Sequence, residues 1–148
     1  MTVLLKRVTD RLPIDFAELE ADAKVEGHSH LTRFATEFAQ SPAMFHAIFS
    51  GYVDGKLAGV GAITDEPGLT SQPRWRMRRL YVHRKFRRRN VARTIAMALL
   101  QEAAEKVPIV TVHAGNCGAA LFWEAIGFRP TAGFAWSHET TSGTTTRA

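Results

Sequence analysis

Leu80-Tyr81-Val82-His83-Arg84-Lys85-Phe86-Arg87-Arg88-Arg89-Asn90-Val91-Ala92-Arg93 is an apolar strand pattern that runs through a loop crowded with cations straight into a helical pattern. A helix start offers unpaired backbone N–H groups and about half a positive charge from the helix dipole. A pyrophosphate bound there meets hydrogen-bond donors in a favourable field, and flanking arginines add bidentate donors for the same oxygens. The sequence therefore predicts a binding site for a phosphate ester in this loop.

The positive charge of the chain is concentrated in the same region. The 148 residues include 19 Lys and Arg against 14 Asp and Glu, a formal net charge of +5. By direct count, ten of the 19 basic residues fall between Arg74 and Arg93. A local basic surface indicates a local anionic partner. A phosphate-bearing coenzyme fits this description, and so does a nucleic-acid backbone.

The length and composition agree with a small protein that builds one core. A chain of this length fits one domain, and 45% apolar residues is ordinary for such a domain. No apolar run reaches the length of about 18 residues that a membrane span requires. The first charges, Lys6 and Arg7, follow a short apolar stretch, which is the reverse of a secretion signal, so we expect a cytoplasmic protein. Cys117 is the only cysteine, which excludes an intrachain disulfide and a thiolate metal site.

Residue periodicity predicts one α/β domain in which strands and helices alternate. Strands are expected at residues 3–9, on both sides of Asp54-Gly55 between 45 and 65, at 75–82, at 109–112, and at Phe128 and 134–139. Helices are expected at residues 13–25, 29–41, 90–106 and 119–126. The segment 65–73 is expected to be a loop. The domain should end at residue 139, and the small polar residues 140–148 should form a disordered tail.

Several single residues refine this outline. Asp54-Gly55 is typical of a tight hairpin, and Gly127 suits a left-handed helix cap. Gly59 and Gly61 indicate a bulge or a close approach of two backbones. Unbroken alternation in the strand 75–82 predicts two faces, with Arg76 and Arg78 on one. The other face would carry Trp75, Met77, Arg79 and Tyr81.

Two motifs resemble those of one known family. Arg87-x-x-Asn90-x-Ala92 resembles Arg/Gln-x-x-Gly-x-Gly/Ala, the acyl-CoA signature of the GCN5-related N-acetyltransferase (GNAT) family. Downstream, the family's ending Asn-x-x-Ala-x-x-Phe/Leu-Tyr-Glu-Lys-x-Gly-Phe is similar to Asn116-x-x-Ala119-x-x-Phe122-Trp123-Glu124-x-Ile126-Gly127-Phe128. Two motifs in the right order make the resemblance specific, and it covers residues 57–139.

The resemblance implies a fold and a reaction. The fold would be a single-domain GNAT-like mixed sheet of about six to seven strands, flanked by about four helices. The reaction would transfer acetyl from acetyl-CoA, a co-substrate, to a primary amine by direct attack in a ternary complex, without a metal. The acceptor would be the amine of a small molecule or of a peptide.

The resemblance also assigns roles to residues. The Val82 backbone N–H would point at the thioester carbonyl, in the gap where the central strand splays from the strand that ends at His113. Asn116 would hydrogen-bond the pantetheine arm. The implied acyl-CoA site comprises Leu80, Tyr81, Val82, Arg87, Arg88, Arg89, Asn90, Val91, Ala92, Arg93, Asn116 and Phe122.

Asn90 stands where the family has glycine. Glycine serves there because the backbone must approach a phosphate closely or adopt positive φ. Asparagine tolerates the left-handed region and is also among the best helix N-caps. Two interpretations stay open: Asn90 replaces the glycine in its backbone role, or it is a plain N-cap that touches no ligand.

Two further departures concern catalysis. Trp123 stands where many relatives have a tyrosine that protonates the departing thiolate, and indole cannot serve as that acid. Arg76 stands where some relatives have a glutamate base, and guanidinium cannot be a base. Deprotonation of the amine must then fall to Asp65, Glu66, His113, ordered water or solvent. His113 is the best single candidate because histidine titrates near neutrality. The alternative that stays open is a purely structural role for His113.

The acceptor cannot be read from the sequence beyond a few candidate residues. His28 and His30 lie between the first two helices, where the family forms its acceptor site. Arg76 and Arg78 favour an amine that also carries a carboxylate or a phosphate. Two other functions stay open for the protein as a whole. It could be a nucleic-acid-binding module, or a GNAT-like protein that binds acyl-CoA without turning it over. A homodimer is also left open.

Overall fold

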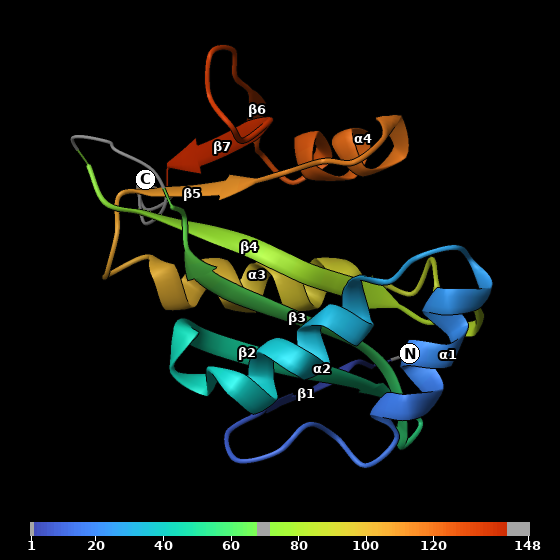
Figure 1. The fold of residues 1–148 in the computed structure, drawn as a ribbon. Helices are drawn as coiled ribbons and strands as arrows, with labels where there is room; N and C mark the ends of the chain where they lie inside the picture. The colour runs from blue at the N-terminus through green and yellow to red at the C-terminus, as the bar shows by residue number, and fades with distance from the viewer. Residues whose placement is uncertain (1, 68–71, 142–148) are drawn as a thin grey trace.

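The centre of the molecule is a seven-stranded mixed sheet in the order β1-β2-β3-β4-β5-β7-β6 (Figure 1). The computed structural model describes residues 2–67 and 72–141. Strands β4 and β5 are parallel, and every other neighbouring pair is antiparallel. The strands are β1 (Leu4–Arg7), β2 (Phe45–Val53), β3 (Lys56–Asp65), β4 (Arg74–Val82), β5 (Ile109–Val112), β6 (Arg129–Pro130) and β7 (His138–Thr141). The predicted α/β class and mixed sheet are confirmed.

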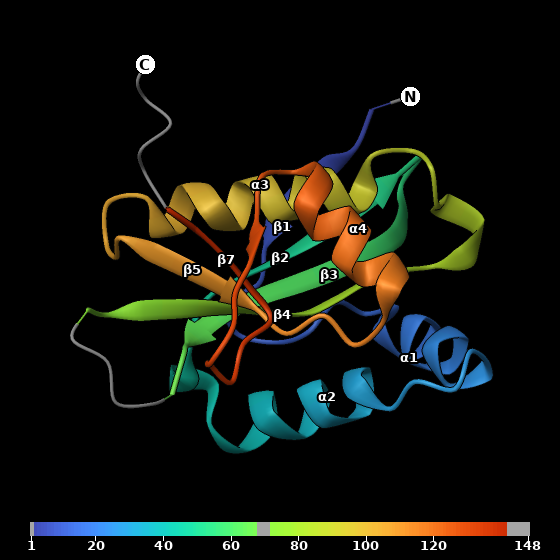
Figure 2. The same ribbon diagram turned by 90° about the horizontal axis from the view of Figure 1, so that it is seen from above.

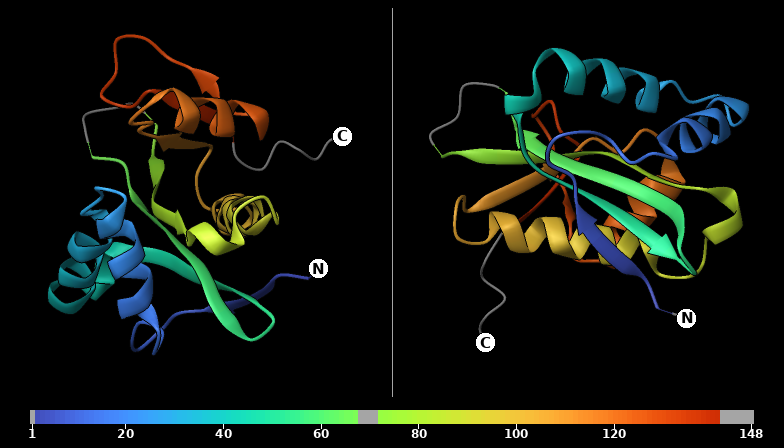
Figure 3. Two further views of the ribbon diagram at one scale, coloured as in Figure 1. Left: turned by 90° about the vertical axis from the view of Figure 1, so that its right-hand side faces the viewer. Right: turned by 90° about the horizontal axis from the view of Figure 1, so that it is seen from below.

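Helices cover both faces of this sheet (Figures 2 and 3). On one face lie α1 (Phe16–Val25) and α2 (His30–Gln40), and on the other lie α3 (Val91–Ala103) and α4 (Cys117–Ala125). Each pair buries a separate apolar core against the strands. We call them the α1/α2 core and the α3/α4 core. None of the described helices has the length and apolar character that crossing a membrane requires.

Several helix boundaries depart from prediction. Phe16, Leu19 and Ala23 are buried as the pattern predicted, but Ile14 is 99% exposed because α1 begins only at Phe16. The helix α3 ends at Ala103, short of the predicted 106. The helix α4 begins two residues earlier than predicted, because the Asn116 side chain accepts a hydrogen bond from the backbone N–H of Ala119 at 2.8 Å.

The predicted turn residues adopt the expected conformations. Asp54 and Gly55 both have positive φ, 51° and 78°, and join β2 to β3 as a tight hairpin. Gly127 has φ 110° beyond the end of α4. There the Phe128 N–H donates to the Trp123 carbonyl at 3.0 Å and the Gly127 N–H to the Glu124 carbonyl at 3.1 Å. This paired capping closes α4 as its glycine predicted.

The C-terminal part departs further from prediction. The expected strand 134–139 is observed only from His138, since residues 132–137 form a series of bends. Phe134 in those bends stacks on Trp136 with ring centroids 4.6 Å apart. The strand β7 continues to Thr141, so the predicted domain end at 139 falls inside it, and residues 142–148 of the predicted tail lie outside the described residues.

A bulge interrupts β4 and reverses its alternation. Val60 pairs with Tyr81 and Ala62 with Arg78, so two residues of β4 oppose the single Gly61, and Arg79 takes φ 61°. Met77 therefore packs in the α3/α4 core while Tyr81 packs in the α1/α2 core. The predicted common face for Met77, Arg79 and Tyr81 is wrong, because that prediction assumed unbroken alternation.

The two parallel strands separate where β4 approaches this bulge. Pairing between β4 and β5 covers three residue pairs and ends with Arg76 opposite Thr111. Beyond that point, no further β4–β5 pair occurs among the described residues, although β4 continues to Val82. The predicted splay of the central strand is therefore observed. It opens the sheet between the end of β4 and the end of β5.

Candidate functional site

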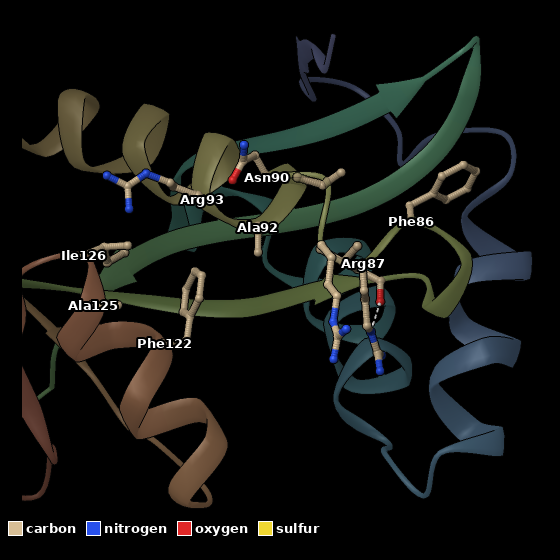
Figure 4. A pocket seen from close by; sticks show the side chains of 11 residues that line it. Phe86, Arg87, Asn90, Ala92, Arg93, Phe122, Ala125 and Ile126 are labelled. Carbon is tan, nitrogen blue, oxygen red and sulfur yellow. Dashed lines mark hydrogen bonds between the residues drawn. The ribbon is translucent and has the colours of Figure 1, made fainter. Parts of the chain in front are cut away.

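Two cavities meet at the opening between β4 and β5. A cavity of about 320 Å³ lies between the start of α3 and α4 (Figure 4), and one of about 860 Å³ lies beside β4 and the α1–α2 connection. Both are lined by Val82, Arg87, Ala92 and Phe122. Because they share these walls, the two cavities adjoin, and we call the pair the passage; it extends from the loop before α3 to the end of β5.

Most residues of the predicted acyl-CoA site line this passage. Those in the smaller cavity are Val82, Arg87, Arg88, Asn90, Val91, Ala92, Arg93 and Phe122. Leu80 and Tyr81 line the larger cavity. Two predicted residues line neither: Arg89 lies over the Phe86 ring at 5.9 Å, and Asn116 caps α4. The helix α4 and its C-cap bring Phe122, Ala125 and Ile126 opposite the start of α3, as Figure 4 shows.

Asn90 holds the loop in a left-handed conformation, with φ 62° and ψ 18°. Its side chain makes no capping hydrogen bond, whereas its carbonyl accepts from the Thr94 N–H at 2.9 Å and from the Thr94 hydroxyl at 2.6 Å. Arg88, two residues earlier, also has positive φ, 65°. Asn90 therefore adopts the positive φ for which glycine serves in the family, and its side chain does not cap the helix.

Arg87 is bound to the protein itself. Its Nε donates to the Val82 carbonyl at 3.1 Å, the bond drawn in Figure 4, and its Nη1 donates to Glu26 Oε2 at 3.0 Å. Its Nη2 also donates to Glu26. These hydrogen bonds lower the pKa of Glu26 and raise that of Arg87. Arg87 therefore fixes the loop to α1, and Arg88 and Arg93 are the other arginines of the smaller cavity.

A second carboxylate of α1, Asp22, holds the other end of the same loop. It accepts hydrogen bonds from the Tyr81 hydroxyl at 2.7 Å and from the Arg84 Nε at 2.8 Å and backbone N–H at 3.1 Å. Burial alone would raise the pKa of Asp22, but these bonds outweigh it and lower that pKa to about 2. Burial and the two carboxylates raise the pKa of Tyr81, so its hydroxyl stays protonated.

Sequence reasoning missed Asp22 and Glu26. The signal that could have found them is their four-residue spacing, which places both carboxylates on one side of the end of α1. The bonds from Glu26 to Arg87 span 61 residues, and those from Asp22 to Arg84 span 62. Both carboxylates therefore tie α1 to the predicted phosphate loop.

His113 follows β5 directly and lines the larger cavity. Its Nε2 lies 2.8 Å from Glu66 Oε1, and the Thr111 hydroxyl donates to the same oxygen at 2.5 Å. The Glu66 side chain is 1% exposed, whereas that of His113 is 27% exposed. With Nε2 donating to the carboxylate, Nδ1 is the nitrogen left to accept a proton.

The structure separates the candidate bases. Glu66 and His113 form one pair, in which Glu66 is buried and His113 reaches the cavity. Asp65 instead bonds His46, with 2.8 Å between Oδ1 and Nε2, and the His46 ring stacks on Trp75 at 3.9 Å. Asp65 lines neither part of the passage.

The remaining predicted residues gather around the larger cavity. Trp123 is 7% exposed and makes edge contacts with Phe122 and Phe128, with centroids 4.9 and 5.2 Å apart. His28 and His30 contact each other's rings at 5.4 Å, and burial lowers the pKa of His30. The larger cavity is lined by Trp123, Arg76, His28 and His30. Within the described part of the chain, no cluster of three or more His, Cys, Asp or Glu side chains could hold a metal ion.

Comparison with known families identifies the chain. The profile of the Acetyltransferase (GNAT) family matches residues 14–128. The chain belongs to the GNAT acetyltransferase family. The two motifs that suggested this membership lie at the passage between α3 and α4, and the resemblance is confirmed.

Solved structures share the GNAT fold with this family member. A protein from Exiguobacterium sp. 255-15 assigned as an acetyltransferase matches with TM-score 0.84 and 19% identity, covering 95% of this chain and 94% of that chain. The NatC complex bound to Gag peptide and CoA matches with TM-score 0.71 and 14% identity, covering 95% of this chain and 99% of that chain. A mutant AtaT toxin bound to the C-terminus of the antitoxin AtaR and acetyl-CoA matches with TM-score 0.70 and 14% identity, covering 96% of this chain and 94% of that chain. No curated protein matches the sequence.

Proposed function

We propose that this GNAT family member transfers an acetyl group from acetyl-CoA to a primary amine of an acceptor. One observation carries the proposal, the two adjoining cavities that extend from the loop before α3 to the His113–Glu66 pair. Similar structures contain acetyl-CoA in the AtaT complex and CoA with a peptide in the NatC complex. These contents support a coenzyme at one end of the passage and an acceptor at the other.

The residues of the passage have separate roles in the proposed reaction. Backbone N–H groups at the start of α3 would hold the pyrophosphate, aided by Arg88 and Arg93. The backbone of Val82 would face the thioester carbonyl, and Phe122 and Ala92 would line the path of the pantetheine arm. Tight positioning of this kind supplies several kcal/mol of a reaction barrier.

The bond changes need one base and no enzyme nucleophile. The amine nitrogen attacks the thioester carbonyl carbon, the C–S bond breaks, and the amine proton passes to Nδ1 of His113, giving an amide and free CoA. A thiolate with a pKa of about 8.5 leaves readily near neutrality, so the missing acid at Trp123 is tolerated. Cys117 is exposed and lines neither cavity, which supports direct attack without an acyl-enzyme.

Binding of acetyl-CoA is expected to stabilise the fold. A ligand that binds only the native state adds about 2.7 kcal/mol at a hundred times its Kd, which raises the unfolding midpoint by several degrees. Thermal unfolding with and without acetyl-CoA measures this shift. S-acetylpantetheine, which lacks the pyrophosphate, is the control and should give a much smaller shift. An unchanged midpoint with acetyl-CoA would falsify the proposal.

Replacement of Asn90 by valine is expected to weaken acetyl-CoA binding more than replacement by glycine. Left-handed backbone costs a β-branched residue about 1–2 kcal/mol, whereas glycine adopts it freely. Asn90 has φ 62° at the start of α3. Calorimetric titration with acetyl-CoA should give a Kd about fivefold to thirtyfold higher for Asn90→Val. Equal affinities of the two variants would contradict a backbone role for this position.

Replacement of His113 by glutamine is expected to lower kcat by about 10²- to 10⁴-fold at neutral pH, the usual contribution of a general base. The loss should shrink as pH rises, because the amine then loses its proton to solvent. Glu66→Gln should reduce the rate less, since it orients His113 without touching substrate. A pH–rate profile for each variant makes the test. Parallel profiles for wild type and His113→Gln would assign His113 a structural role instead.

The nucleic-acid alternative is disfavoured by how the arginines are used. Arg78 and Arg79 both pair with Glu37, Arg84 pairs with Asp22, and Arg87 pairs with Glu26. The aromatic side chains that could stack on bases are also engaged, since Tyr81 is buried and the Trp75 ring stacks on His46. Four of the ten basic residues between Arg74 and Arg93 are thus ion-paired within the protein, which reduces the charge available to a phosphate backbone.

A further inference from the structure

Four arginines line the larger cavity on its acceptor side. Arg33 comes from α2, and Arg76, Arg78 and Arg79 come from β4. We call this group the arginine wall. The bulge at Arg79 is the reason that two successive residues of β4, Arg78 and Arg79, both reach Glu37 on α2. A regular strand would have turned one of them to the opposite face.

The arginine wall carries more positive charge than the protein neutralises. Glu37 accepts from Arg78 Nη2 at 3.1 Å and from Arg79 Nε and Nη2 at 3.1 and 2.8 Å, so one carboxylate serves two guanidinium groups. Arg33 and Arg76 form no ion pair with any described residue. Arg33 and Arg76 therefore add positive charge to the cavity lining without an ion-pair partner of their own among the described residues.

Arg76 and Arg78 also hold unused hydrogen-bond donors. The Nε atoms of both are buried and have no partner among the described residues. Burial lowers the pKa of Arg76, and the neighbouring charge of Arg79 lowers it further, against the opposing effect of Glu66 and Glu37. A bound anion would relieve this repulsion and occupy the fork of a guanidinium, whose geometry matches a carboxylate or a phosphate.

The arginine wall faces the same cavity as the proposed chemistry. Arg76 lies directly opposite Thr111 in the register of β4 with β5, and His113 follows two residues after Thr111. The cavity is lined by Val82 and His113 as well as by the four arginines. An acceptor anchored at Arg76 through an anionic group would therefore hold its amine within reach of His113, whereas a polycationic acceptor would be repelled.

We propose that the acceptor is a small primary amine that also carries a carboxylate or a phosphate, bound by Arg76 together with Arg33 and Arg78. This inference rests on the proposed acetyl transfer, and it adds the chemical class of the substrate.

Matched pairs of amines that differ in the anionic group test the preference. Ethanolamine is compared with phosphoethanolamine, and propylamine with β-alanine, at saturating acetyl-CoA. In the wild type, kcat/KM should favour an anionic member by about tenfold or more, the usual effect of a charge-assisted bond. Arg76→Gln should abolish most of this preference, because it lowers kcat/KM for the anionic amine far more than for the neutral one, and Arg76→Lys should fall between. The pair that responds distinguishes phosphate from carboxylate.

Arg11→Gln is the matched control, because Arg11 is exposed and lines neither part of the passage. It should behave as the wild type toward both members of each pair. Equal kcat/KM for anionic and neutral amines, or an Arg76→Gln variant that loses activity equally toward both, would overturn the inference.

A binding measurement separates this inference from the proposed function. Protein saturated with CoA, so that the pyrophosphate site is filled, is titrated calorimetrically with phosphoethanolamine, β-alanine and ethanolamine. Tighter binding of an anionic amine in wild type than in Arg76→Gln supports the arginine wall even if no acetylation is seen, in which case the proposed transfer fails. A thermal shift with acetyl-CoA combined with equal binding of all three amines would leave the proposed function intact and remove the inference.

Discussion

Replacing Trp123 by alanine is expected to lower the free energy of unfolding by about 3 to 5 kcal/mol, the cost of deleting a buried aromatic ring. Trp123 is 7% exposed and packs edge-on against Phe122 and Phe128 in the α3/α4 core. It also accepts, through its carbonyl, the hydrogen bond that closes α4. Urea denaturation with a constant m value measures the loss.

Two variants show whether packing is the whole role of Trp123. Leu121→Ala changes a residue of the same helix that is 67% exposed, and should alter stability by no more than about 0.5 kcal/mol. Trp123→Phe should keep most of the turnover, because the ring fills the site without taking part in proton transfer. A Trp123→Phe variant that is stable but inactive would assign the indole a direct part in catalysis.

Replacing Gly59 by alanine is expected to destabilise the fold by about 1–3 kcal/mol, as overpacking of a tight interior does. A Cβ at this position would lie 2.8 Å from the Tyr81 carbonyl oxygen and 3.1 Å from Val82 Cγ2. The first of these atoms is backbone, so it can move only if β4 moves. Since Gly59 pairs with Val82, the variant should also raise the Kd for acetyl-CoA.

Gly51 supplies the matched control, because it faces Gly59 in the register of β2 with β3. A Cβ at Gly51 would meet Ile95 Cδ1 and Val91 Cγ1, each at 3.3 Å, and these side-chain atoms can shift. Denaturation curves of both variants should therefore show the smaller loss for Gly51→Ala. A larger loss for Gly51→Ala would contradict a close approach of the β3 and β4 backbones.

The features that the sequence predicted well are those determined within a few residues. The strand, cationic loop and helix from Leu80 to Arg93, the hairpin at Asp54-Gly55 and the cap at Gly127 each depend on local backbone preferences. The close approach at Gly59 was also predictable, because a strand glycine signals missing space for a side chain. The loop's own contribution to the lining of the smaller cavity, from Arg87 to Arg93, followed from the loop motif in the same way.

The features that escaped prediction depend on partners far apart in the chain. Arg87 was expected at a phosphate because its loop is cationic, yet Glu26, 61 residues away, takes its guanidinium. His113 was one of several candidate bases until Glu66, 47 residues away, gave it a buried carboxylate partner. No local pattern encodes such pairs. The bulge at Arg79 was not predicted. Alternation of residue types indicates a regular strand, but the residue at which the alternation breaks has no distinguishing feature in the sequence.

That bulge has a consequence for comparing homologues. One inserted residue in β4 determines that Met77 packs against α3 and α4 while Arg78 reaches α2. In a relative that lacks the insertion, the residues aligned with these two would exchange faces, although an alignment anchored on the motif at Arg87 would look unbroken. Acceptor preference should therefore be transferred only between relatives whose strand β4 contains the same inserted residue before the loop that leads to α3.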